Sequence, residues 1–127
     1  LVTLSACETG VSQILRGDEP MGLVRAFLAA GARAVLVTQW PVDDLATFLL
    51  MGRFYGLIQA QAGVDLAAAL HRAQSWLQAL TRAEAQTILD QDAIALPENW
   101  GQMGAAERPF APPVYWAGFI LVGQGAA

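Results

Sequence analysis

Two short apolar runs and one helical stretch make up the first forty residues. Residues 1–7 are apolar and favour β structure, and residues 33–40 form a second run of this kind. Between them, apolar side chains recur at helical spacing from Pro20 to Ala30, and Gly31 supplies a stop for that helix. This order predicts a strand, a crossover helix and a second strand parallel to the first.

Capping residues predict where the next helices begin. Pro41 ends the second strand, and Asp43 or Asp44 caps a helix that extends to about Ala60. Either carboxylate can accept the unpaired amides of the first turn, so the sequence leaves open which of the two is the cap.

Two more helices follow in the second half of the chain. Asp65 caps the first of them. Thr81 and Glu84 form a T-x-x-E capping box for a shorter helix that reaches about Leu89. The apolar face of the helix after Asp65 is expected to consist of Leu66, Leu70, Ala73, Leu77 and Leu80.

The remaining segments complete the predicted fold. Residues 91–113 are rich in proline and irregular, which predicts a surface loop, and residues 114–122 form a third apolar run, read as a strand. Continuous rather than alternating apolar strands imply a sheet that is covered on both faces. The expected fold class is therefore α/β, with a mostly parallel sheet between helices.

Composition narrows the classes of protein that the chain can represent. The 127 residues suit one domain, and a hydrophobic fraction of 55 % excludes a disordered chain. Seven Lys and Arg residues against eleven acids give a net charge of −4, which argues against nucleic-acid binding. The longest apolar stretches, about eight residues, fall short of a bilayer span. No secretory signal is visible, and a single cysteine excludes an internal disulfide, so a cytoplasmic location is expected.

The chain begins at Leu1, without an initiator methionine and directly in a predicted strand. Domains usually begin with a few loose polar residues. We therefore expect residues 1–127 to be a segment of a longer protein.

Candidate chemistry lies where the first two predicted strands end, because sites in such folds lie at the carboxyl ends of strands. Cys7 closes the first strand, and its thiol can serve as a nucleophile or as a small buried apolar group. A nucleophile elbow needs glycine two residues before and after the nucleophile, but Ser5 and Thr9 stand there. Trp40 ends the second strand, where it is expected to be half core and half pocket wall.

Five blocks of sequence resemble the CHAT domains, a caspase-like family often attached to tetratricopeptide repeats. The blocks occur in the family's order and cover nearly the whole chain apart from the loop at 91–113. They are residues 4–10 (LSACETG), 22–32, 40–55 (beginning WPVDD), 69–74 and 115–119 (YWAGF).

The resemblance implies a three-layer caspase–hemoglobinase fold and a cysteine endopeptidase. In that family the cysteine at the position of Cys7 attacks a peptide carbonyl and forms a thioester. A histidine protonates the leaving amine, and backbone N–H groups, including that of Cys7, stabilise the oxyanion. The family histidine lies on a strand upstream of the cysteine.

The only histidine, His71, does not fit that role. It falls opposite the apolar face of its predicted helix, which is typical of a solvated surface residue. The chain is therefore expected to be the cysteine-bearing C-terminal part of a CHAT domain, inactive alone. Its expected partners are the histidine-bearing upstream part, tetratricopeptide repeats and a protein substrate.

The resemblance also suggests a substrate pocket. In the related separases, an aspartate of the Trp-x-Val-x-Asp block faces a basic P1 side chain, and Asp44 aligns with it. Trp40 and Asp43 are the other expected pocket residues, although one aspartate is expected to cap the helix. A carboxylate there would favour arginine, which it can bind through two hydrogen bonds.

Two functions remain in competition at this stage. The first is a caspase- or separase-like cysteine endopeptidase. The second is a catalytically inactive docking module coupled to upstream repeats. No cofactor is expected, and one histidine and one cysteine, far apart in the sequence, do not build a metal site.

Overall fold

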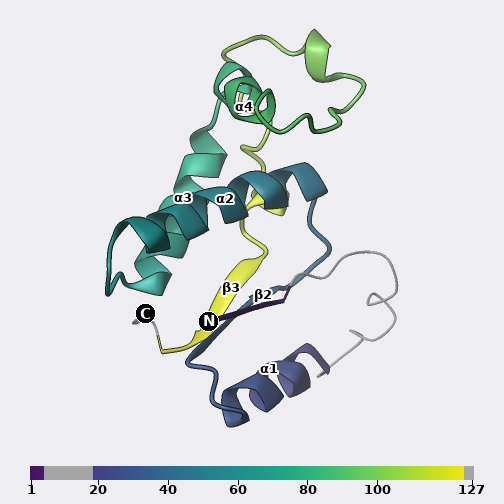
Figure 1. Cartoon of the computed structure of the whole chain (residues 1–127). Coiled ribbons are helices and arrows are strands. Elements are labelled where there is room, and N and C mark those ends of the chain that lie inside the picture. The colour runs from purple at the N-terminus through teal and green to yellow at the C-terminus, as the bar shows by residue number, and fades with distance from the viewer. Residues whose placement is uncertain (5–18, 125–127) are drawn as a thin grey trace.

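A three-stranded mixed sheet with four α-helices forms the part of the chain that the structure describes (Figure 1). The structure is a computed structural model and describes residues 1–4 and 19–124. The strands lie in the order β1, β2, β3. Their bounds are Val2–Leu4 for β1, Ala34–Thr38 for β2 and Phe119–Gly123 for β3.

The predicted strand, helix and strand at the start of the chain are confirmed. β1 and β2 pair in parallel, with Val2 opposite Val35 and Leu4 opposite Val37. The intervening helix α1 spans Glu19–Ala29. Gly31 follows it with φ +100°, a backbone conformation that glycine adopts without strain. Residues 5–7, the expected end of the first strand, lie outside the described residues.

The predicted helix caps of the second half are also present. The Asp65 carboxylate accepts the Ala67 amide at 3.0 Å. Thr81 and Glu84 form the reciprocal capping box, in which each side chain accepts the other's backbone amide. The helices that follow β2 are α2 (Asp44–Ala60), α3 (Leu66–Ala79) and α4 (Arg82–Leu89).

The helices lie on both sides of the sheet, with α2 and α3 on one side and α1 on the other (Figure 1). Along β2, Leu36 belongs to the large core with Phe54 of α2 and Leu77 of α3. Val35 points to the opposite face because side chains alternate along a strand, and it is buried there, as is Val24 of α1. The expected burial of both faces of β2 is therefore confirmed.

The third strand begins five residues later than the apolar run predicts. Residues Pro113–Tyr115 form a 3₁₀ turn, and the carbonyl of Pro113 accepts the amides of Trp116 and Ala117. Two consecutive prolines at this point lack the N–H groups that a strand needs. Pairing with the sheet starts only where the Gln39 amide donates to the Gly118 carbonyl at 2.8 Å.

The sheet is mixed, so the expectation of a mostly parallel sheet is wrong for β3. This strand runs antiparallel to β2, with Phe119 opposite Thr38 and Gly123 opposite Ala34. β3 thus enters the sheet at the carboxyl end of β2 and leaves at its amino end. The long connection through residues 91–113 sets this direction, and an apolar run carries no information about it.

The connection at residues 91–113 is mostly exposed and carries two buried aromatic side chains. Trp100 and Phe110 are both 3 % exposed, and their ring centroids lie 6.2 Å apart. The Arg82 amide at the start of α4 donates to the Glu107 carbonyl at 2.8 Å. Within the described part of the chain, no helix is long and apolar enough to cross a membrane.

Candidate functional site

The carboxyl ends of β1 and β2 lie side by side at one edge of the sheet. Leu4, the last residue of β1, is paired with Val37, and β2 ends one residue later at Thr38. Residues 39–43 then lead directly into α2. This edge is where the sequence places the candidate chemistry, but Cys7 itself lies outside the described residues.

Asp43 is the helix cap. Its backbone is extended, with φ −61° and ψ 135°, and its Oδ2 accepts the Ala46 amide at 2.9 Å. The Thr47 hydroxyl donates to the Asp43 carbonyl at 2.8 Å. The choice that the sequence left open is therefore settled in favour of Asp43, whose carboxylate is committed to the backbone of α2.

Asp44 is the first residue of α2, and its side chain is exposed. In the part of the chain that the structure describes, no hydrogen bond or ion pair engages its carboxylate. The two neighbouring aspartates thus have different environments: one carboxylate caps the helix, and the other is exposed.

Removal of each carboxylate in turn should have different effects on the stability of the protein. We expect Asp43→Ala to lower the free energy of unfolding by about 1 kcal/mol, because the Ala46 amide in the first turn loses its side-chain acceptor. Asp44→Ala should change it by less than about 0.5 kcal/mol, as is usual at an exposed position. Urea denaturation of both variants measures the difference, and equal losses would contradict the assignment of the cap.

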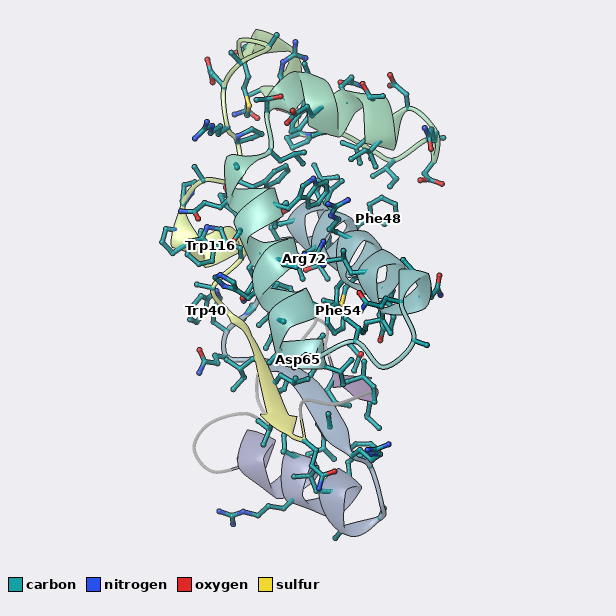
Figure 2. The ribbon with its side chains drawn as sticks, turned by 90° about the vertical axis from the view of Figure 1, so that its left-hand side faces the viewer. Trp40, Phe48, Phe54, Asp65, Arg72 and Trp116 are labelled. Carbon is teal, nitrogen blue, oxygen red and sulfur yellow. The ribbon has the colours of Figure 1, made fainter. Side chains whose placement is uncertain are left out.

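Trp40 is half-buried between the end of β2 and the start of α2, as the sequence suggested. Its indole Nε1 donates to the Val114 carbonyl at 3.1 Å. In Figure 2, Trp40 and Trp116 lie on the same side of α3, and Phe48 and Phe54 lie on the other side with α2. The segment before β3 therefore forms part of the surroundings of Trp40.

Sequence reasoning did not assign this segment to the site. Gln74 of α3 reinforces it, because its Nε2 donates to the carbonyls of Trp116 and Phe119 at 2.9 and 3.0 Å. The only signal in the sequence was the YWAGF block at residues 115–119, which matched the family without indicating a contact with Trp40.

The remaining candidates have structural surroundings that agree with the sequence. His71 is exposed on α3. The indoles of Trp100 and Trp116 donate to the Gln86 side chain and the Ala111 carbonyl, and the guanidinium of Arg53 lies 5.4 Å from the Trp76 ring centroid. Among the described residues, no group of three or more His, Cys, Asp or Glu side chains could hold a metal ion.

Two open hollows lie away from this edge. The larger, of about 390 Å³, lies between α3 and α4, and the smaller, of about 290 Å³, lies between α2 and α4. Trp76 and Ile88 line both of them. Neither hollow is lined by Trp40, Asp43 or Asp44.

The fold and this edge define an α/β domain with its candidate site at the carboxyl ends of two parallel strands. The chain matches the CHAT domain model over residues 1–124. It therefore belongs to the CHAT-domain family.

Two relatives carry tetratricopeptide repeats in their names. The chain is 30 % identical over 124 residues to human tetratricopeptide repeat protein 28 and 29 % identical over 124 residues to the mouse protein of the same name. Each match covers 98 % of this chain and 4 % of the relative's length. No solved structure gives a significant match to the chain.

Proposed function

We propose that the chain supplies the nucleophile and part of the substrate pocket of a caspase- or separase-like cysteine endopeptidase. One observation carries the proposal: the carboxyl ends of β1 and β2 share an edge, with Trp40 and Asp44 directly beyond β2. Cys7 comes three residues after Leu4, and three residues of chain reach at most about 11 Å. The proposal accordingly has the thiol act beside these pocket residues. The mixed sheet with helices on both sides is compatible with the caspase–hemoglobinase sandwich expected of this family.

The proposed reaction is acyl transfer to a thiol. The Cys7 thiolate attacks the scissile carbonyl, and the C–N bond breaks to leave a thioester and an amine that takes a proton from a histidine. Water then attacks the thioester, which releases the acid and returns the thiol. Backbone N–H groups, among them that of Cys7, stabilise the oxyanion in both steps.

The histidine of this reaction is proposed to come from the upstream part of the same protein. His71 is exposed on α3, as expected of a solvated surface residue, so it is not offered as the proton donor. Activity therefore has to be measured on the full natural polypeptide that carries these residues. The substrate of that polypeptide is proposed to be a protein.

Asp44 is proposed to select a basic P1 side chain. Asp44→Asn should lower kcat/KM for cleavage after arginine by about 10- to 100-fold, because an ion pair with the guanidinium is lost. Cleavage after alanine should change by less than about threefold. Kinetics on peptides that differ only at P1 measure both effects.

Asp43→Asn is the matched control for this prediction. It removes the same charge one residue earlier, and asparagine also serves as a helix cap. We expect it to leave the preference for arginine intact. A wild-type enzyme that cleaves after alanine as fast as after arginine would contradict the role of Asp44.

The second candidate function is a docking module without catalysis, which the tetratricopeptide repeat proteins among the relatives favour. The rate at which iodoacetamide alkylates Cys7 in the full polypeptide separates the two. A peptidase needs a reactive thiolate, so alkylation near neutral pH should be at least about tenfold faster than that of a free cysteine. Alkylation no faster than that of a free cysteine would favour the docking module.

A further inference from the structure

We propose that Gly118, which lies far from Trp40 in the sequence, is a positioning residue of the candidate site. It fixes the position of the Trp40 indole. The claim that Gly118 affects substrate binding rests on the proposed function, in which Trp40 forms a wall of the pocket. The claim that Gly118 positions Trp40 rests only on the contacts between the two residues. The two claims can therefore be tested separately.

The space at Gly118 is taken by the indole of Trp40. A Cβ added to Gly118 would lie 2.8 Å from Cε2, 3.0 Å from Nε1 and 3.2 Å from Cζ2 of that ring. These distances are shorter than van der Waals contact, and the atoms belong to a rigid ring rather than to a flexible chain end. Glycine is thus required at position 118 because any side chain there would overlap the Trp40 indole.

Two hydrogen bonds hold the indole against this glycine. The Gln39 amide, one residue before Trp40, donates to the Gly118 carbonyl at 2.8 Å. The Trp40 Nε1 donates to the Val114 carbonyl at 3.1 Å. Residues 114–118 therefore contact the backbone neighbour of Trp40, the ring atoms of its indole and the indole nitrogen.

The position of Trp40 suits a pocket wall better than a simple core anchor. Trp100, which does anchor the core, is 3 % exposed, whereas Trp40 is only half-buried. Trp40 also lies four residues before the exposed Asp44, with Pro41 between them restricting the backbone. A methyl group at position 118 would displace the indole from the place that it takes beside Gly118.

The direct test follows the Trp40 ring in the full polypeptide labelled with 5-fluorotryptophan. Its ¹⁹F resonance is assigned by its loss in Trp40→Phe. Gly118→Ala should shift this resonance, whereas Gly56→Ala should leave it in place. Gly56 is a matched control because a Cβ there meets nothing within 4 Å. An unshifted Trp40 resonance in folded Gly118→Ala would overturn the inference.

A double variant keeps the test decisive if Gly118→Ala does not fold. Phenylalanine lacks the five-membered ring that contributes the closest atoms, so Gly118→Ala should be tolerated in a Trp40→Phe background. We expect the double variant to melt within about 3 °C of Trp40→Phe alone, as for a neutral change. If alanine at 118 prevents folding in both backgrounds, Gly118 does not act through Trp40 and the inference fails.

Kinetics test the claim about substrate binding. With an arginine peptide, Gly118→Ala should raise KM by about tenfold or more and change kcat by less than about threefold, because a displaced pocket wall weakens substrate binding in the ground state and the transition state alike. An unchanged KM despite a shifted Trp40 resonance would reduce Gly118 to a packing role and overturn the pocket claim. A wild-type polypeptide without peptidase activity would instead remove the proposed function, and the resonance would still decide whether Gly118 positions Trp40.

Discussion

Cys7→Ala should abolish peptide cleavage by the full polypeptide, with a fall in kcat of at least about 10⁴-fold. Without the thiol no thioester forms, and only the oxyanion donors and substrate binding remain to accelerate the reaction. KM should change little, because alanine leaves the proposed pocket residues Trp40 and Asp44 in place. Hydrolysis of a fluorogenic arginine peptide measures the loss.

His71→Ala is the matched control for this experiment. The histidine is exposed on α3, so its removal should leave both kcat and folding unchanged. Cleavage that survives Cys7→Ala would contradict the assigned nucleophile. Cleavage lost with His71→Ala would show that the only histidine of the chain takes part after all.

Phe54→Ala should be the most destabilising single change in the described core. Phe54 is the largest of the fully buried side chains, at 0 % exposure, and its ring packs at an angle of 64° against Tyr55. Truncation leaves a cavity between α2 and the rest of the core, which costs about 3–5 kcal/mol of the free energy of unfolding. Urea denaturation followed by circular dichroism measures this loss.

Phe48→Ala is the matched control, because it removes the same side chain from the same helix at an exposed position. Phe48 is 40 % exposed, and we expect its truncation to cost less than about 1 kcal/mol. Figure 2 shows both residues on the side of the molecule formed by α2. Equal losses for the two variants would contradict the placement of the core.

The helices were predictable because their start signals are local. Asp65 and the pair Thr81 and Glu84 accept amides two or three residues away, so the sequence contains both partners of each cap. The apolar face predicted for α3 lies in the core for the same reason: a period of 3.6 residues fixes which side chains share a face.

The third strand was predictable only in part. Its apolar run from residue 114 marks a segment with buried side chains, but the start and the direction depend on distant partners. Pairing begins where Gly118 meets Gln39, and the antiparallel direction follows from the route of the chain after α4. The apolar run itself contains no information on its pairing partner or on the route of the chain.

The sequence predicted where in the fold the candidate site lies, but it did not predict most of the contacts between the residues there. The rule that sites lie at the carboxyl ends of strands located the edge that bears Trp40 and Asp44. Two adjacent aspartates look alike in the sequence, and only the backbone geometry assigns the cap to Asp43. The contact between Trp40 and Gly118 joins residues far apart in the chain, so no local pattern reports it.

The most direct test of the central claim is covalent labelling of the nucleophile. The full polypeptide is incubated with a peptidyl acyloxymethyl ketone that ends in arginine, and the adduct is located by mass spectrometry of the digested protein. The account predicts one adduct, on Cys7, that forms much more slowly with the corresponding alanine probe. A Cys7 that stays unmodified while the protein is folded would contradict the peptidase and favour the docking module.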